Sequence, residues 1–449
     1  MPKLFGTDGI RGRVGQWPLC DEIVSKVGYS SAIAAVRFYT NREKVVLIGR
    51  DTRGSGKVLL RDLATGLKSA GLTVVDLGII TTPAVAFLTK DSGAVMGVSI
   101  TASHNSAEFN GIKLISPTGE KVSDEIETWI EDLTDKLATM PKIASTRGKV
   151  VDGKRYVKRY KSHAHKKFKG FVKPLSIVID CANGAAYKIA PEIISSLGAK
   201  IRVICNVPDG KNINRACGSL YPDKLRSAVV AEHADLGLAF DGDGDRLIVV
   251  NSAGELVNGD HLLYLIARDY AQRKLLNKNM VIITHMANTG LVEKLEEHGI
   301  STVRVRVGDR YVGEGMKSTG AVLGGEPVGH IILRRHLPTG DGIITALQIL
   351  KIIGDKPDIL EDVVRDIPQY PLVLVNVPVK RKMEDGEMMT HEVRCVVERQ
   401  EKLLGNPHRI NVRPSGTEPY IRVMVEAKDR VKVQTAAESI AVAIKKTII

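Results

Sequence analysis

Asp241-Gly-Asp-Gly-Asp-Arg246 lies between two apolar runs, Leu236-Gly-Leu-Ala-Phe240 and Leu247-Ile-Val-Val250. The apolar and β-branched flanks predict two strands, and the hexapeptide is then the loop that joins them. Its glycines allow the backbone angles of a tight loop, and its three carboxylates bring hard oxygen ligands close together. Oxygen ligands favour Mg²⁺ or Ca²⁺ over zinc. The stretch therefore predicts a strand–loop–strand unit that carries a metal site.

Three other interpretations of this loop remain open from the residues alone. An EF-hand would need Gly and Glu where the chain has Arg246 and Ser252. A haloacid-dehalogenase-like phosphatase would use Asp241 as its nucleophile, but it usually has Thr or Val at the position of Asp245. A turn without metal would leave three carboxylates to repel one another. The metal loop is the interpretation that these comparisons favour.

Length and composition limit the class of protein. A chain of 449 residues is too long for one core and predicts three or four domains. Its 43% apolar and 26% charged residues are typical of a soluble globular protein. No apolar run approaches the ~20 residues of a membrane span, and the N-terminus opens no signal peptide, so we expect a cytoplasmic protein with no membrane partner. Five scattered cysteines favour reduced thiols over disulfides or zinc: Cys20, Cys181, Cys205, Cys217 and Cys395.

The net charge of +13 implies anionic partners without identifying them. Aromatic residues make up only 4% of the chain, which is few for stacking on single-stranded nucleic acid. Residues 154–173 carry nine Lys or Arg. Apolar side chains recur there at helical spacing: Val157, Tyr160, Ala164, Phe168 and Phe171. We interpret the segment as an amphipathic helix with a solvated basic face, with a nucleic-acid patch as the alternative, and expect no nucleic-acid partner.

A strand–loop–helix–strand pattern occurs three times. Apolar runs at 44–49, 175–180 and 280–284 each lead into a loop that contains Gly or Asn. Each helical stretch that follows stops at a glycine, and the next strands are expected to begin at Thr73, Lys200 and Ser301. The pattern predicts three α/β domains of related build.

From about residue 368 the pattern changes. Leu372–Val379 and Tyr420–Glu426 are expected strands, and helical stretches lie around 384–404 and 429–447. This predicts a smaller C-terminal α+β domain. The expected domains are residues 1–150, 151–253, 254–367 and 368–449.

Two further loops carry groups suited to chemistry. Thr101-Ala-Ser-His-Asn105 follows the apolar run 95–100, and Ser103 is a candidate nucleophile. It has no G-x-S-x-G elbow, and on spacing alone a polar turn or helix cap is the better interpretation. Arg413-Pro-Ser-Gly-Thr-Glu-Pro419 could present backbone N–H groups and a guanidinium to phosphate, or it could be an ordinary hairpin turn.

Taken in order, the loops resemble those of the α-D-phosphohexomutase superfamily. The resemblance extends from residue 5 to residue 426, and the combination is specific. It rests on Gly6-Thr-Asp-Gly-Ile-Arg11, Thr101-Ala-Ser-His-Asn105, Asp241-Gly-Asp-Gly-Asp-Arg246, Gly325-Glu326 with Gly329-His330, and Arg413-Pro-Ser-Gly-Thr417. Within the superfamily the chain is most similar to bacterial phosphoglucosamine mutases, on Phe5–Gly12, Val307–Val312, Thr339–Gly342 and Ala346-Leu-Gln348.

The resemblance implies three α/β/α domains with mixed sheets and a C-terminal domain around a central cleft. It implies that the enzyme interconverts glucosamine 6-phosphate and glucosamine 1-phosphate through a phosphoserine. Glucosamine 1,6-bisphosphate would be the intermediate and activator, and one Mg²⁺ per chain the metal. Phosphoglucomutase or phosphomannomutase activity on the same scaffold is the near alternative, and a phosphatase using Asp241 the more distant one. The small-molecule phosphosugar is the expected partner, and the sequence leaves a homodimer open.

The resemblance also implies roles around the reacting group. Ser103 would carry the phosphoryl group, and its oxygen would complete a Mg²⁺ site held by Asp241, Asp243 and Asp245. One of Lys113, His104 or His330 would move the hydroxyl proton. The residues expected to surround the reacting group are Arg11, His104, Lys113 and Arg246.

Two more groups of residues are implied to hold the substrate. The sugar would contact Glu326, His330, Gly308, Asp309 and Arg310. The non-reacting phosphate would contact Arg413, Ser415, Gly416, Thr417 and Arg422. The sugar loop departs from the usual Gly-Glu-x-Ser-Gly-His, because this chain has Val328 at the serine position. A hydrogen bond from that serine is absent here, which leaves the choice among hexoses open.

Overall fold

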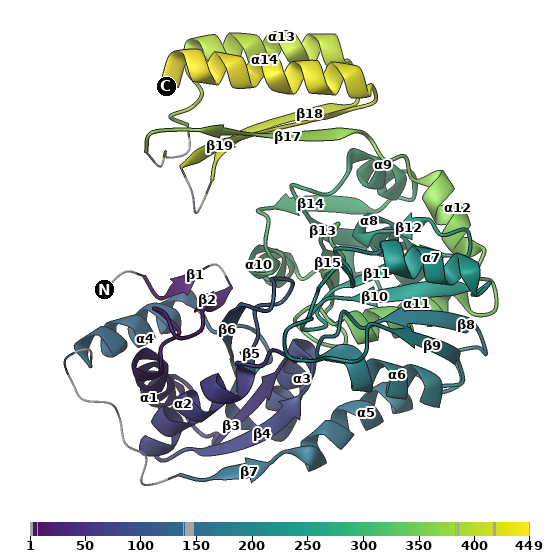
Figure 1. The fold of residues 1–449 in the computed structure, drawn as a ribbon. Helices are drawn as coiled ribbons and strands as arrows, with labels where there is room; N and C mark the ends of the chain where they lie inside the picture. Colours follow the sequence, from purple (N-terminus) through teal and green to yellow (C-terminus); the bar gives the residue numbers. More distant parts are fainter. Residues whose placement is uncertain are drawn as a thin grey trace. The chain divides into compact units, whose positions relative to one another are not determined.

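The computed structural model describes residues 3–6, 8–137, 139, 148–381, 383, 386–415 and 419–448. The chain forms two compact units. Unit 1 comprises Met1–Met286 with His298–Asp366, and unit 2 comprises Ala287–Glu297 with Ile367–Ile449. Unit 1 contains three mixed sheets and unit 2 contains one antiparallel sheet (Figure 1).

The first sheet of unit 1 has seven strands: β1 (Phe5–Gly6), β2 (Gly9–Arg13), β3 (Glu43–Arg50), β4 (Thr73–Ile79), β5 (Ala94–Ile100), β6 (Phe109–Ile115) and β7 (Val150–Asp152). Their order is β1-β2-β6-β5-β3-β4-β7. Strands β5, β3, β4 and β7 run parallel, whereas β1, β2 and β6 add antiparallel pairs. The parallel strands end near one another, so the loops that follow β3, β4 and β5 meet at one edge.

Helices cover both faces of this sheet (Figure 1). On one face lie α1 (Asp21–Phe38), α2 (Gly56–Ser69) and α4 (Asp124–Lys136), whose apolar side chains share one core with the sheet. The helix α3 (Thr82–Ser92) packs against β3 and β5 from the other face. Helices α1 and α2 approach closely because their contact is built on glycine: a Cβ on Gly66 would lie 1.9 Å from the Ser25 carbonyl oxygen, and one on Gly28 would lie 2.3 Å from that of Leu63.

The second sheet has the order β12-β11-β10-β8-β9. Its strands are β8 (Ser176–Asp180), β9 (Lys200–Ile204), β10 (Leu236–Phe240), β11 (Leu247–Asn251) and β12 (Leu256–Val257). The three helices of this part are α5 (Lys154–Phe168), α6 (Ala186–Ser196) and α7 (Asp223–Ala231). Strands β10 and β11 form a buried antiparallel hairpin, and the Asp241–Arg246 loop joins them as predicted.

The third sheet has the order β14-β13-β15-β16. Its strands are β13 (Met280–Thr284), β14 (Ser301–Val305), β15 (Leu323–Gly325) and β16 (Ile331–Leu333). It is accompanied by α8 (Gly259–Gln272), the 3-10 turn η1 (Asn277–Asn279), α10 (Asp309–Thr319), α11 (Gly342–Ile353) and α12 (Ile359–Asp366). The loop between β15 and β16 carries Glu326 and His330.

Unit 2 is the predicted C-terminal α+β domain, joined by one helix from an earlier segment. Its sheet has the order β17-β19-β18, with β17 (Leu372–Pro378), β18 (His408–Pro414) and β19 (Tyr420–Ala427). The long helices α13 (His391–Leu404) and α14 (Arg430–Ile448) share its apolar core. The helix α9 (Thr289–Glu297) is fastened to the sheet by the buried Glu426 carboxylate, which accepts hydrogen bonds from Thr289 N at 2.8 Å and Thr289 Oγ1 at 3.0 Å.

The three predicted strand–helix–strand units are confirmed. The second strand of each unit begins at the expected residue, Thr73, Lys200 or Ser301. The glycines that end the helices adopt left-handed backbone conformations, with φ of 84° at Gly71, 111° at Gly198 and 67° at Gly299. Only glycine adopts such angles without strain, which explains why the helices stop there.

The buried face of the basic helix α5 differs from the expected one. Tyr156, Tyr160, Ala164 and Phe168 are buried at strict four-residue spacing, so Tyr156 takes the place predicted for Val157. The helix ends at Phe168, and Phe171 lies beyond it with 45% of its surface exposed. The prediction of a basic amphipathic helix is confirmed. The residues predicted for its buried face were wrong at both ends.

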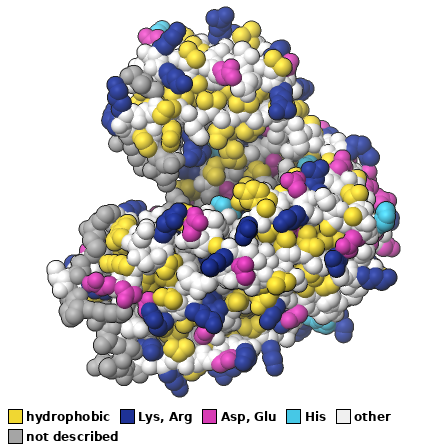
Figure 2. Space-filling model, viewed as in Figure 1, with side chains coloured by type: hydrophobic (Ala, Val, Ile, Leu, Met, Phe, Trp, Pro, Cys, Tyr) yellow, Lys and Arg dark blue, Asp and Glu magenta, His cyan; other side chains and the backbone are white. Residues whose placement is uncertain are grey.

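Charged side chains are spread over the face of the molecule drawn in Figure 2. On the face drawn in Figure 2, Lys and Arg side chains are interspersed with Asp and Glu and do not form one stripe. Within the described ranges, none of the helices is long and apolar enough to cross a membrane.

The glycine contact between α1 and α2 generates a stability prediction. We expect Gly66→Ala to destabilise the protein by at least about 1–3 kcal/mol, because the new methyl group meets backbone atoms that cannot rotate away. The matched control is Gly313→Ala in α10, where an added Cβ meets nothing within 4 Å. That variant should be neutral or more stable by up to about 1 kcal/mol. Urea unfolding of both variants measures the difference, and equal midpoints would contradict the proposed contact.

The N-terminus of α8 generates a pH prediction. Asn258 and His261 form a capping box in which His261 Nδ1 accepts the Asn258 N–H at 3.1 Å, and burial lowers the pKa of His261 to about 4. Between pH about 6.5 and about 4, His261 is therefore protonated in the unfolded chain but neutral in the folded protein. The free energy of unfolding should fall as the pH falls through this window, by up to about 3 kcal/mol. His261→Gln keeps an acceptor for the cap without titrating. Urea unfolding should show a shallower pH dependence for this variant, and an unchanged slope would contradict the assignment.

Candidate active site

The predicted Ser103 loop and the predicted Asp loop meet in unit 1. Ser103 follows β5, and its Oγ donates a hydrogen bond to Asp241 Oδ2 at 2.8 Å. Ser103 is buried and has a φ of 49°, an angle that few residues other than glycine adopt. Its backbone N–H donates to Thr101 Oγ1 at 2.8 Å. The chain thus holds Ser103 in an unfavourable backbone conformation that aims its hydroxyl at the neighbouring sheet.

A buried guanidinium fixes the backbone on which Ser103 sits. Arg53 pairs with the Asp51 carboxylate through Nε at 2.8 Å. Its other donors bond to backbone carbonyls of the Ser103 loop: Ser103 at 3.0 Å, Asn105 at 2.8 Å, Phe109 at 2.8 Å, and Ser106. Asn214, from the second-sheet part of the chain, donates to the Ser103 carbonyl at 2.8 Å. The charge-assisted bonds of Arg53 and the neutral bond of Asn214 hold the loop from two sides.

The three aspartates of the metal loop form a buried cluster. Ligand oxygens of Asp241, Asp243 and Asp245 lie within 4.8 Å of one another. Asp241 Oδ1 accepts the Arg246 N–H at 3.2 Å, whereas Oδ1 of Asp243 and Oδ1 of Asp245 are buried without a hydrogen-bond partner in the described part of the chain. Buried unpartnered carboxylate oxygens are costly unless a cation takes them. The residues present therefore fit a divalent cation that prefers oxygen.

Opposed electrostatic effects separate the pKa values of these aspartates. Burial, together with the negative charges of Asp245 and Asp243, raises the pKa of Asp241 well above its usual value. Burial also raises that of Asp243, but the Lys113 ammonium and hydrogen bonds, including one from Thr82 Oγ1 at 2.8 Å, lower its pKa below the usual range. Crowded carboxylates of this kind share protons until a cation neutralises them.

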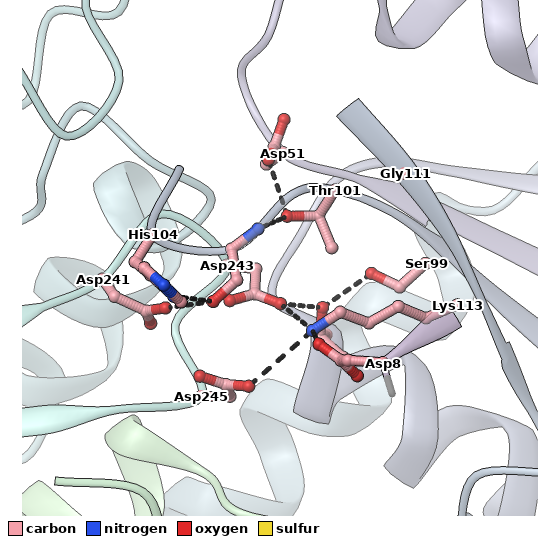
Figure 3. A network of polar contacts seen from close by, with 12 residues as sticks. Asp8, Asp51, Ser99, Thr101, His104, Gly111, Lys113, Asp241, Asp243 and Asp245 are labelled. Carbon is pink, nitrogen blue, oxygen red and sulfur yellow. Dashed lines mark hydrogen bonds and ion pairs between the residues drawn. The ribbon is translucent and has the colours of Figure 1, made fainter. Parts of the chain in front are cut away.

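Lys113 and Asp8 connect the triad to the first strands. Lys113 Nζ lies 3.0 Å from Asp243 Oδ2, 3.0 Å from Asp8 Oδ2 and 3.9 Å from Asp245 Oδ2 (Figure 3). Burial alone lowers the pKa of Lys113, but these carboxylates raise it above its usual value, so its charge is retained. Asp8 also accepts hydrogen bonds from Arg11 and Lys121. The arrangement is an alternating network of buried charges.

Two histidines near the cluster have opposite protonation preferences. His104 Nδ1 lies 3.4 Å from Ser103 Oγ, and burial together with the charges of Arg246 and Arg11 lowers the pKa of His104 to about 4. Burial likewise lowers that of His330, but Asp245, whose Oδ2 lies 3.5 Å from His330 Nδ1, raises it to about 9. At neutral pH the first ring is therefore neutral and the second carries a proton.

The expected sugar loop lies beside the triad within unit 1. A short β-bridge pairs Arg246 with His330, and Glu326 Oε1 accepts the Gly308 N–H at 3.0 Å. Gly329 has a φ of 87°, and a Cβ there would lie 2.0 Å from the Leu247 carbonyl oxygen. The loop is therefore packed tightly against the strand that follows the aspartates. Val328 points outward, with 41% of its surface exposed.

The neighbouring predicted residues make contacts between the parts of unit 1. Asp309 Oδ1 accepts a hydrogen bond from Lys121 Nζ at 2.8 Å. Arg310 pairs with Asp124 and with Glu127 Oε1 at 3.1 Å, both on α4. Asp309 and Arg310 are thus held by the first-sheet part of the chain, and their role toward a sugar stays a prediction.

The predicted phosphate loop lies in unit 2. Arg413 and Arg422 are directly opposite each other on β18 and β19. Ser415 N donates to the Tyr420 carbonyl at 2.8 Å, and Ser415 Oγ and Arg422 Nε are buried without a partner among the residues that the structure describes. Gly416 and Thr417 lie outside the described residues.

The sequence did not predict several residues that position the Ser103 loop and the charge network. Asp51 and Arg53 follow a predicted strand, so polar residues at its carboxyl end were a usable signal. Asp8 lies within the Gly6–Arg11 motif, to which the sequence alone assigns no role for this carboxylate. Asn214 had no signal, because it lies in an irregular loop whose position only the folded chain decides.

A second group of potential metal ligands consists of Asp180, Cys205 and Cys217, whose ligand atoms also lie within 4.8 Å of one another. Both oxygens of Asp180 already accept backbone N–H bonds at 2.8 Å, from Ala182 and Gly218. The two cysteine sulfurs are softer ligands than the oxygens of the aspartate cluster, so the two groups suit different ions.

Sequence comparison assigns most of the chain to one family. Four phosphoglucomutase/phosphomannomutase profiles match: alpha/beta/alpha domain I at residues 2–140, domain II at 154–254, domain III at 258–370 and the C-terminal domain at 374–443. The phosphoglucosamine mutase of Desulforamulus reducens is 43% identical over 443 residues, covering 98% of this chain and 99% of the relative. That of Carboxydothermus hydrogenoformans is 43% identical over 448 residues, covering 99% and 100%.

Solved structures share the fold. A phosphoglucomutase/phosphomannomutase family protein from Burkholderia thailandensis superposes with a TM-score of 0.81 at 23% identity, covering 99% of this chain and 97% of the other. The N-acetylphosphoglucosamine mutase of Aspergillus fumigatus, solved with GlcNAc-6P and magnesium, superposes with a TM-score of 0.68 at 19% identity, covering 99% and 95%. At these identities the likeness concerns the fold.

The aspartate cluster generates a binding prediction. Calorimetric titration of chelator-treated protein with Mg²⁺ should give one site per chain, and Asp243→Asn should weaken binding by at least about tenfold, because a charged ligand is removed. The control is Asp223→Asn, which removes a charge from a side chain that is 90% exposed. Equal affinities for all three proteins would show that the cluster is not the site.

Proposed function

This chain belongs to the phosphoglucomutase/phosphomannomutase family, and from that premise we propose that it interconverts glucosamine 6-phosphate and glucosamine 1-phosphate. Its curated relatives at about 43% identity over nearly the whole length are phosphoglucosamine mutases. The enzyme is thus an intramolecular phosphotransferase. The four domains consist of three α/β/α domains and a C-terminal domain.

The observation that carries the proposal is the contact between Ser103 and Asp241. A serine hydroxyl from the first-sheet part of the chain is hydrogen-bonded to the aspartate cluster of the second-sheet part at 2.8 Å. A phosphoryl group on Ser103 would therefore lie beside the cation site. Arg53 and Asn214 hold the serine backbone there, so the acceptor oxygen is positioned before substrate arrives.

Asp241, Asp243 and Asp245 would hold Mg²⁺ in this enzyme. When bound, the ion would neutralise negative charge on the transferring phosphoryl group. The chain itself contributes further fixed positive charge from Lys113, whose ammonium is held by three carboxylates, and from Arg246 and Arg11. In a buried site, charges that are already oriented stabilise the transition state without reorganisation.

The proposed reaction proceeds in two transfers. The free hydroxyl of the substrate attacks the phosphorus on Ser103; the bond to Ser103 Oγ breaks, and the sugar becomes a 1,6-bisphosphate. After the sugar has turned round, Ser103 Oγ attacks the phosphorus at the other end; the bond from that phosphorus to the sugar oxygen breaks, Ser103 regains a phosphoryl group, and the sugar leaves as the other monophosphate. His104 is our candidate for moving the hydroxyl proton, because its ring is neutral and lies 3.4 Å from Ser103 Oγ.

Substrate recognition is assigned to the remaining predicted residues. Glu326, with His330 close by, would hold the sugar hydroxyls. The paired Arg413 and Arg422 with Ser415 would hold the phosphate that does not react. Val328 contributes no hydrogen bond to a sugar, so we expect the distinction between glucosamine, glucose and mannose phosphates to rest mainly on Glu326.

Three further points belong to the proposal. The domain limits are 1–150, 151–253, 254–367 and 368–449. Glucosamine 1,6-bisphosphate activates the enzyme by loading Ser103. The protein works in the cytoplasm.

Turnover of glucosamine, glucose and mannose phosphates tests the function. We expect glucosamine phosphate to be preferred, and Ser103→Ala to lower its turnover by at least about a hundredfold because the phosphoryl carrier is lost. Peptide mass spectrometry should find phosphate on Ser103, and added glucosamine 1,6-bisphosphate should increase it.

The control is Ser106→Ala, which makes the same change at an exposed side chain three residues away and should leave turnover intact. Phosphate on Asp241 that hydroxylamine removes would replace the proposal with a phosphatase mechanism. A preference for glucose or mannose phosphate would keep the mutase chemistry and overturn the assigned sugar.

A further inference from the structure

A polar cavity lies in unit 1, lined by side chains outside the candidate active site. It has a volume of about 430 Å³. Its walls come from the C-terminal ends of α5 and α8, from the segment after β16 and from α11. Basic residues dominate its lining: Lys167, Arg273, Arg335 and Lys351, with Asp269 as its one carboxylate. None of these residues takes part in the proposed reaction.

Charge is unbalanced in this cavity. Asp269 is already paired with Arg273, whose Nε lies 2.6 Å from Oδ1. Lys167, Arg335 and Lys351 have no carboxylate within ion-pair distance in the described part of the chain. Partial desolvation, and then repulsion from Arg335 and Lys351, lower the pKa of Lys167, whose side chain remains exposed. Three elements therefore bring cations together without a compensating anion.

Two ordinary explanations account for only part of this arrangement. The helix dipole favours Lys167 and Lys351, which lie in the last turns of α5 and α11. Lys351 Nζ also lies 4.1 Å from the centre of the exposed Phe171 ring. Each interaction is local to one side chain. Neither accounts for the convergence of both lysines with Arg335, which lies outside a helix.

Neutral groups in the same cavity suit an organic phosphate. The rings of Phe168 and His336 stack with centroids 5.7 Å apart, and His336 Nδ1 is buried without a partner among the described residues. Gln348 adds an amide and Tyr270 an aromatic side chain. Several converging cations match a multiply charged phosphate better than a single carboxylate. The volume is in the range of small-molecule sites and exceeds what inorganic phosphate alone would fill.

We propose that the cavity lined by Lys167, Arg335, His336 and Lys351 is a binding site for a phosphorylated small molecule, separate from the active site. The ligand's phosphate groups contact the two lysines and Arg335, and its organic part lies against the Phe168–His336 ring pair. This explains why the basic end of α5 faces a hollow in the protein as well as bulk solvent.

Titration calorimetry with pyrophosphate, in the presence of chelator, tests the site. We expect Lys351→Gln and Arg335→Gln each to weaken binding by about five- to tenfold, since each removes one charge-assisted contact at a partly solvated site. Two charge-matched controls separate other sources of binding. Lys158→Gln removes a charge from the exposed surface of the same helix α5, and Arg246→Gln removes one from the active site. Both should retain the cavity's affinity.

Each alternative outcome overturns the proposal. Binding lost in Arg246→Gln but intact in the cavity variants would place pyrophosphate in the active site alone. An equal loss in Lys158→Gln and Lys351→Gln would show general attraction to a basic surface. Thermal unfolding supplies an independent readout: pyrophosphate should raise the melting temperature of the parent protein, and should raise that of the double variant Lys167→Gln/Lys351→Gln less.

Discussion

The pairing of Arg53 with Asp51 is the constraint on which the candidate site depends. Both side chains are fully buried, and the guanidinium donates to backbone carbonyls along the Ser103 loop. A buried ion pair needs hydrogen bonds to its remaining donors, and here the loop supplies them. These bonds hold the loop in the conformation that places Ser103 in a left-handed backbone region. The buried Arg53–Asp51 pair therefore orients the Ser103 hydroxyl through the backbone of its loop.

Close backbone approach allows the second-sheet part to reach this loop. A Cβ on Gly242 would lie 2.4 Å from the Ser103 carbonyl oxygen, so any other residue there would separate Asp241 from Ser103. A Cβ on Gly342 would likewise lie 2.6 Å from the Arg246 carbonyl oxygen. The glycines of the metal loop therefore serve two purposes. They permit its tight turn, and they let three parts of unit 1 bring their charges together.

Charge is arranged differently around the aspartate cluster and in the basic cavity of unit 1. Around the aspartate cluster, carboxylates lie beside cations: Lys113 contacts both Asp8 and Asp243. One oxygen of Asp243 and one of Asp245 have no hydrogen-bond partner among the described residues. Such a network rigidifies its members, which suits a site where atoms must be positioned before reaction. In the basic cavity, Lys167, Arg335 and Lys351 repel one another. This unpaired positive charge favours the binding of an anionic ligand.

The sequence by itself determined the three strand–helix–strand units, because apolar periodicity and glycine stops act over a few residues, as at Thr73 and Gly71. It also identified Asp241–Asp245 as an oxygen-rich loop between strands, since that chemistry lies within one hexapeptide. Only the tertiary structure decided that Asp8, Lys113 and Asp243 form one network, and that Asn214 supports Ser103. Those residues are far apart along the chain, so their contacts depend on sheet packing and close glycine approaches that no local pattern encodes. The same reason explains the wrong ends of the buried face of α5, where packing against neighbouring helices selected Tyr156 over Val157.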